Sequence, residues 1–122
     1  MNKLLILNPN LAKKNQEKFI FFVKIFWKIK NYKNFCEIIK PDVISIDYDV
    51  DPKIISQEIN IPIQGGPDPK FLLGDKDQIK KEAIKYLDIF NHYPYIFNLG
   101  HGILPETDPL MVDYLVKLIK DY

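Results

Sequence analysis

The sequence predicts an α/β protein whose strands run parallel to one another. Three observations carry this prediction: short apolar runs typical of buried strands, an Asp-Pro pair after each of three such runs, and a helical or turn-forming segment after each pair. Asp as an N-cap followed by Pro at the first helical position favours a helix start. Consecutive βα units of this kind build a doubly wound sheet or a (β/α)₈ barrel, and both place their chemistry at the carboxyl ends of the strands.

The first third of the chain differs from the rest. Residues 1–41 carry nine Lys and neither Asp nor Gly. We interpret the apolar run Phe19–Val23 as a strand buried on both faces, and Asn34–Ile39 as a short helix that ends before Pro41. Lys24–Lys33 shows no turn chemistry that we can place. A membrane-surface anchor is the alternative interpretation of the mixed Phe, Trp and Lys residues in this region.

The alternation of strands and helices begins at residue 42. Val43–Asp47 reads as a strand, and Asp51-Pro52 then opens a helix. Ile61–Gln64 reads as a second strand, which Gly65-Gly66 closes. Asp68-Pro69 opens a short helical turn, for which Asp68 is interpreted as the N-cap.

The second half of the chain continues the pattern. The short turn is predicted to end at Gly74, and Asp75 caps the clearest helix of the sequence. Tyr95–Leu99 is predicted to be a third strand, and Asp108-Pro109 opens the last helix. The apolar faces expected of these two helices are Ile79, Ala83, Tyr86, Leu87 and Phe90 for the first, and Met111, Leu115, Leu118, Ile119 and Tyr122 for the second.

Composition excludes several classes of protein. Lys contributes all 17 basic residues, 16 residues are acidic, and the formal charge of +1 argues against nucleic acid as the main partner. The lone Cys36 can form neither an internal disulfide nor a Cys-rich zinc site, and we assign it no redox role. The sequence has no apolar run of membrane-spanning length and no signal-peptide pattern, so we expect a cytoplasmic protein without membrane partners.

His101 is the strongest candidate for chemistry. It follows a strand and lies between Gly100 and Gly102, which let backbone and ligand approach closely. A histidine in this position can donate a hydrogen bond to a carboxylate. A loop histidine held by a backbone carbonyl is the plainer alternative. His92 is expected at the opposite, amino end of the next strand, and we interpret it as structural.

The other polar positions give weaker signals. Gly65-Gly66 is consistent with a phosphate-binding turn, but no glycine-rich fingerprint or Walker motif surrounds it, and a tight turn beside a ligand explains it equally well. Asp47, Asp49 and Asp51 could together bind a hard cation, although Asp51 is already used as a cap. No Ser-His-Asp or Cys-His arrangement stands out. Plausible metal ligands are also lacking, and we predict no metal site in the chain.

Three motifs resemble the C-terminal part of the uroporphyrinogen decarboxylase family. Tyr95–Pro109 reads Y-I-F-N-L-G-H-G-I-L-P-E-T-D-P, which is similar to the family's N-L-G-H-G-I-x-P-x-T-x-P signature. Val43–Asp47 resembles a family strand end, and Ile63–Pro69 resembles the family's Q-G-N-L-D-P turn, with Gly66-Pro67 in place of Asn-Leu. The resemblance covers about residues 31–122, whereas residues 1–30 match poorly.

The resemblance implies a (β/α)₈ barrel, of which this chain would hold about three to four strands and their helices. It implies removal of carbon dioxide from the acetate side chains of uroporphyrinogen, without metal or organic cofactor, to give coproporphyrinogen in haem biosynthesis. His101 matches the family's substrate-contacting histidine. From the same resemblance we expect an active-site loop that contains Gln64, Gly65, Gly66, Gly100 and Gly102.

The family's arginine-rich loop, its central aspartate and its substrate-binding tyrosine have no counterpart in this sequence. We therefore expect no catalytic residue in this chain and no turnover by this chain alone. One hypothesis is the C-terminal part of a decarboxylase, from a truncated, split or frameshifted gene. A second is a non-catalytic piece that docks with a separately encoded N-terminal part, or with itself. The resemblance also implies the homodimer typical of the family. A third is a relative of the barrel methyltransferases, which tight zinc binding would favour.

Overall fold

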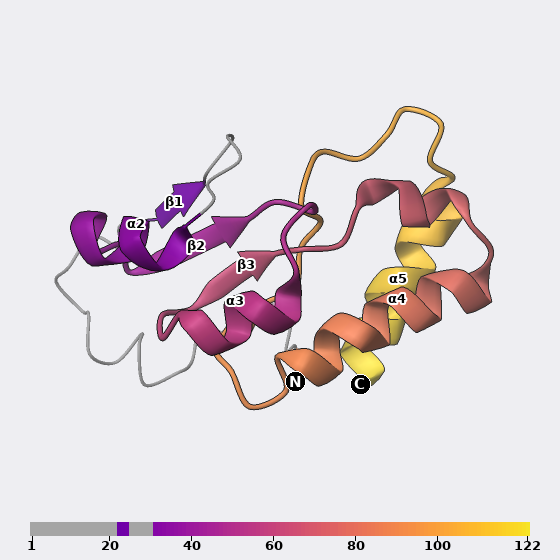
Figure 1. Cartoon of the computed structure of the whole chain (residues 1–122). Helices are drawn as coiled ribbons and strands as arrows, with labels where there is room; N and C mark the ends of the chain where they lie inside the picture. Colours follow the sequence, from indigo (N-terminus) through magenta and orange to yellow (C-terminus); the bar gives the residue numbers. More distant parts are fainter. Residues whose placement is uncertain (1–21, 25–30) are drawn as a thin grey trace, which may run out of the picture.

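A computed structural model describes residues 22–24 and 31–122, and its centre is a parallel sheet (Figure 1). The strands are β1 (Phe22–Lys24), β2 (Val43–Ile46), β3 (Ile63–Gly65) and β4 (Tyr95–Ile96). They form one four-stranded sheet in the order β1-β2-β3-β4, and each neighbouring pair is parallel. The predicted α/β class with a parallel sheet is therefore confirmed.

Helices follow the strands along the chain. They are α2 (Tyr32–Ile39), α3 (Pro52–Glu58), the 3₁₀ turn η2 (Pro69–Leu73), α4 (Lys76–Ile89) and α5 (Pro109–Asp121). Figure 1 shows α4 and α5 lying side by side at one end of the sheet, with α3 beside β2 and β3. No helix in the described part of the chain is long and apolar enough to cross a membrane.

The predicted Asp caps are confirmed. The side chains of Asp51, Asp68 and Asp108 each accept a hydrogen bond from the backbone N–H two residues later, at 2.8, 2.9 and 2.8 Å. Asp75 forms a full capping box with Gln78, in which each side chain bonds the other's backbone N–H. Four acidic side chains thus satisfy amide groups that a helix start leaves without partners.

Several predicted boundaries are wrong: β2 ends at Ile46, one residue before the predicted Asp47, and α2, β3 and β4 differ for local reasons. Helix α2 starts at Tyr32, ahead of the predicted Asn34, because the side chain of Asn31 caps it. β3 starts at Ile63 and includes the first glycine of the turn; Pro62 just before it has no N–H to donate to a neighbouring strand.

β4 ends at Ile96 rather than at Leu99. The amide of Leu99 bonds the side chain of Asn98, and the amide of Gly100 bonds a loop carbonyl, so neither extends the strand ladder. Of the predicted strand Phe19–Val23, residues 19–21 lie outside the described residues, and the last two belong to β1.

The core lies between the sheet and α4 and α5. All four residues of β2 are buried, and Ile44 and Ile63, which pair across the sheet, are fully inaccessible to solvent. The predicted inward face of α4 is confirmed at Ile79, Ala83, Tyr86 and Phe90, with Leu87 partly buried. On α5, Leu115 and Ile119 are buried and Met111 and Leu118 are partly buried, whereas Tyr122 is exposed at the end of the helix, where its hydroxyl bonds Asp88.

Candidate functional site

The loops that follow β2, β3 and β4 meet at Gly100. Its N–H donates a 2.8 Å hydrogen bond to the carbonyl of Pro67, in the loop after β3. A Cβ atom on Gly100 would lie 2.5 Å from the amide nitrogen of Tyr48, in the loop after β2, and 2.9 Å from the carbonyl oxygen of Gly66. These contacts are with backbone, which cannot swing aside as a flexible side chain can. The close approach therefore requires glycine at this position.

The turn after β3 needs its two glycines for the same kind of reason. Gly65 and Gly66 have φ values of +97° and +132°, a region that other residues avoid. A Cβ on Gly65 would lie 2.6 Å from the carbonyl oxygen of Ile46, and one on Gly66 would lie 2.3 Å from a ring carbon of Tyr86. Tyr95, on β4, stabilises this turn, because its hydroxyl donates a 2.8 Å hydrogen bond to the carbonyl of Gly65. The geometry supports a tight turn and requires no phosphate.

His101 lies directly beside this junction and is exposed. Its imidazole makes no hydrogen bond to any residue that the structure describes, so the plainer alternative of a histidine held by a backbone carbonyl gains no support there. A Cβ on the neighbouring Gly102 would meet no atom within 4 Å, so open space surrounds this side of the loop. The structure thus leaves His101 accessible to a ligand at the carboxyl end of the sheet.

Gln64, a predicted site residue, and His92, interpreted as structural, lie in different places. Gln64 lies on β3, half-buried, in register with Ser45 of β2 and Ile96 of β4. Side chains alternate along a strand, so Gln64 faces away from the core residue Ile63 and from the helices that cover it. His92 is exposed in the turn between α4 and β4, at the amino end of that strand, where it was expected.

The carboxylates after β2 are used locally. One Asp47 oxygen accepts a 2.7 Å hydrogen bond from the amide of Tyr48, and Asp51 caps α3. Within residues 22–24 and 31–122, no three His, Cys, Asp or Glu side chains are grouped closely enough to hold a metal ion, so the alternative cation site of Asp47, Asp49 and Asp51 is not assembled. Cys36 is half-buried on α2, and burial raises the pKa of its thiol.

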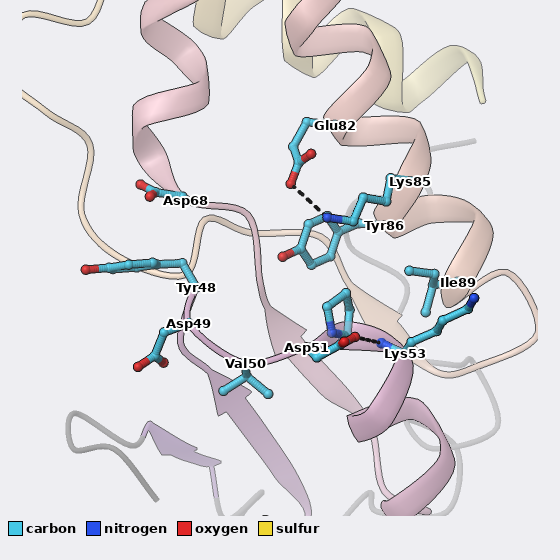
Figure 2. Close-up of a pocket in the computed structure, with 11 residues that line it drawn as sticks. Tyr48, Asp49, Val50, Asp51, Lys53, Asp68, Glu82, Lys85, Tyr86 and Ile89 are labelled. Carbon is cyan, nitrogen blue, oxygen red and sulfur yellow. Dashed lines mark hydrogen bonds and ion pairs between the residues drawn. The ribbon is translucent and has the colours of Figure 1, made fainter. Parts of the chain in front are cut away.

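A hollow of about 480 Å³ lies on the helical side of the same loops, between the loop after β2 and helix α4 (Figure 2). Tyr86 is 3% exposed, and Figure 2 shows its hydroxyl directed into the hollow. Burial, with the negative charges of Glu82, Asp51 and Asp68, raises the pKa of this hydroxyl to about 12. Sequence reasoning treated Tyr86 only as part of the apolar face of a helix; the one signal was its hydroxyl, because the other residues of that face are pure hydrocarbon side chains.

Comparison with known proteins gives the family. The family model described as "Uroporphyrinogen decarboxylase (URO-D)" matches residues 9–122. The chain belongs to the uroporphyrinogen decarboxylase family. The match starts upstream of residue 31, where the motif resemblance begins, and it includes both the turn after β3 and the loop of His101.

Curated relatives agree with this assignment. The uroporphyrinogen decarboxylase of Wolbachia sp. subsp. Drosophila simulans is 44% identical over 91 residues, which are 75% of this chain and 27% of the relative. That of Rickettsia bellii is 42% identical over 96 residues, 75% of this chain and 27% of the relative. That of Orientia tsutsugamushi (strain Boryong) is 37% identical over 120 residues, 93% of this chain and 34% of the relative. The chain therefore spans about a third or less of the length of these uroporphyrinogen decarboxylases.

Proposed function

We propose that this chain supplies the C-terminal part of a uroporphyrinogen decarboxylase site and binds a porphyrinogen carboxylate through His101. The observation that carries the proposal is the junction at Gly100, where three loops meet through backbone contacts and leave the adjacent His101 exposed. Gly66 belongs to that junction, and Gln64 and Gly65 directly precede it on β3. The residues that carry the family resemblance thus gather at one end of the parallel sheet.

The role proposed for His101 is to bind and orient a carboxylate of the substrate. A protonated imidazole donates charge-assisted hydrogen bonds to a carboxylate, which are stronger than neutral ones. Gly100 and Gly102 leave no side chain on either flank, so a bulky polycarboxylate can reach the ring. In the proposed reaction the protonated pyrrole of the substrate accepts the electrons released with carbon dioxide. The reaction then needs no metal or organic cofactor, and the protein positions the substrate, excludes water and handles protons.

The same proposal assigns the reacting centre to a partner piece. Positioning contributes a large part of enzymatic rate enhancement, and this chain has no Arg with which to clamp a substrate that bears several carboxylates. The family's arginine loop and aspartate would come from the N-terminal part of such an enzyme. The chain alone is then expected to turn over no substrate.

The sheet itself favours docking as the accompanying role. β1 and β4 are its outer strands, and no other described strand pairs with their outer edges. Open edges of a parallel sheet present unpaired N–H and C=O groups that another strand can satisfy. We propose that the N-terminal part adds strands at both edges and closes a (β/α)₈ barrel, with the homodimer of the family formed by closed barrels.

Reconstitution tests the proposal. The N-terminal portion of the Wolbachia decarboxylase, ended where its match to this chain begins, is mixed with this chain, and coproporphyrinogen is measured anaerobically. Turnover by the mixture, with none from either piece alone, is the expected result. Turnover by this chain alone would show that the site needs no N-terminal part. If the two pieces form a complex that has no activity, the chain is a docking piece and its proposed contribution to the site is wrong.

A further inference from the structure

The ring of Tyr48 is exposed beside the junction of the three loops. Of the Phe and Tyr side chains whose exposure the structure describes, only Tyr48 and Tyr122 are exposed, at 45% and 41%. Tyr122 ends the chain after α5, and its hydroxyl bonds Asp88. The Tyr48 side chain, in contrast, forms neither a hydrogen bond nor a ring contact with any residue that the structure describes. Its ring is therefore available to a ligand.

The backbone that carries this ring is held from two sides. The amide of Tyr48 donates a 2.7 Å hydrogen bond to a carboxylate oxygen of Asp47, and the amide of Val50 donates to the carbonyl of Asp47 at 3.4 Å. These two bonds close a turn around Tyr48. On the other side its backbone packs against Gly100, whose added Cβ would lie 2.5 Å from the Tyr48 amide nitrogen. A ring on a fixed backbone binds a ligand with little loss of conformational entropy.

Tyr48 and His101 are neighbours across the junction. A Cβ on Gly100 would lie 2.9 Å from the Cα of Tyr48, and consecutive Cα atoms are about 3.8 Å apart, so the Cα atoms of Tyr48 and His101 are no more than about 8 Å apart. Figure 2 shows the Tyr48 ring extending from its loop with the hydroxyl on the side away from Tyr86. Both Tyr48 and His101 are exposed, so one small ligand group can contact both.

The charges near Tyr48 favour a ring over a second carboxylate. Asp47 and Asp49 flank Tyr48 in the sequence, so a carboxylate placed there would meet like charges. A pyrrole is uncharged, its N–H can donate to an acidic side chain, and its face can pack against a phenol ring. An acetate side chain joins its carboxylate to the pyrrole through a single CH₂ group. A carboxylate bound by His101 therefore brings its own pyrrole close to Tyr48.

We propose that the ring of Tyr48 packs against the pyrrole whose acetate carboxylate is bound by His101. This inference rests on the proposed function and extends it, because His101 recognises the charge of the acetate and Tyr48 recognises the ring that carries it. The pair selects acetates attached to a flat ring over aliphatic carboxylates. The contact uses the ring of Tyr48 and not its hydroxyl, which gives it a distinct mutational signature.

Anaerobic titration calorimetry of the full chain with uroporphyrinogen tests the inference. Tricarballylate, which has carboxylates but no ring, is the second probe. Tyr48→Leu removes the ring and keeps an apolar side chain, whereas Tyr48→Phe keeps the ring and removes the hydroxyl. Tyr122→Leu is the matched control at the other exposed tyrosine, and His101→Ala tests the carboxylate contact separately.

Tyr48→Leu is expected to weaken uroporphyrinogen binding about fivefold, the effect of losing one aromatic contact, and to leave tricarballylate binding unchanged. Tyr48→Phe and Tyr122→Leu should bind both probes as the unmodified chain does. The inference is overturned by unchanged uroporphyrinogen binding in Tyr48→Leu, by an equal loss in Tyr48→Phe, or by an equal loss for both probes. Absence of uroporphyrinogen binding to the unmodified chain also overturns it.

Failure of the proposed function has a different signature. His101→Ala should weaken the binding of both probes, because each presents carboxylates to the imidazole. If His101→Ala binds both probes as tightly as the unmodified chain, the proposed carboxylate contact is wrong. If His101→Ala weakens both and Tyr48→Leu weakens neither, the carboxylate contact stands and the pyrrole contact is wrong.

Discussion

Replacement of Gly100 by alanine is expected to separate the three loops that form the candidate site. The added methyl group would lie 2.5 Å from the amide nitrogen of Tyr48, 2.9 Å from its Cα and 2.9 Å from the carbonyl oxygen of Gly66. Heavy atoms in ordinary contact lie about 3.5–4.0 Å apart, so the backbone must move by roughly 1 Å. The movement also strains the 2.8 Å hydrogen bond from Gly100 to Pro67.

The magnitude follows from these two losses. Overpacking costs about 1–3 kcal/mol and a lost hydrogen bond about 0.5–1.5 kcal/mol, so Gly100→Ala should lower the free energy of unfolding by about 2–4 kcal/mol. Gly102→Ala is the matched control: its methyl group would meet nothing within 4 Å, and its effect should stay within about 0.5 kcal/mol. Urea unfolding followed by circular dichroism measures both. Equal stability of the two variants would refute the argument that the loops meet at Gly100.

Three further predictions concern the scaffold. Asp75→Ala should cost about 1 kcal/mol through loss of the capping box, and Asp77→Ala, in the same first turn, should cost less in the same urea assay. Tyr95→Phe should cost about 1 kcal/mol, because the turn carbonyl that its hydroxyl bonds at 2.8 Å loses a donor; a thermal melt that matches the unmodified chain would show that this bond contributes nothing. The pKa values of Tyr86 and Tyr93 are raised to about 12 by burial, so the fold favours their neutral forms and stability should fall as pH rises from about 10 to 12. Tyr93→Phe should flatten this decline in urea midpoints, and an unchanged slope would contradict the assignment.

The helix starts could be predicted from the sequence because their causes are local. An Asp side chain reaches its own helix amides within two or three residues, so Asp51, Asp68, Asp75 and Asp108 carry the signal within one turn of chain. The same reasoning missed the start of α2, where Asn31 performs the identical role after a segment with no recognised turn chemistry.

The strand ends and the hollow beside α4 depend on contacts between distant residues, which no local pattern contains. β4 stops short because the amide of Gly100 bonds the carbonyl of Pro67, which lies 33 positions earlier in the chain. Tyr86 appears in the sequence as one apolar position of a helix. Only the fold brings its hydroxyl under the influence of negative charges from three segments, those of Glu82, Asp51 and Asp68.

The central claim, that His101 belongs to a substrate site at the carboxyl end of the sheet, is tested most directly by comparing the two histidines in the reconstituted enzyme. His101→Ala and His92→Ala both replace exposed loop histidines at opposite ends of β4, so neither should change stability by more than about 0.5 kcal/mol. The measurement is anaerobic decarboxylation of uroporphyrinogen by each variant mixed with the N-terminal part. His101→Ala should lose at least about tenfold in kcat/KM, the effect of one charge-assisted hydrogen bond, while His92→Ala keeps full activity. Full activity of His101→Ala, or an equal loss in both variants, would contradict the account.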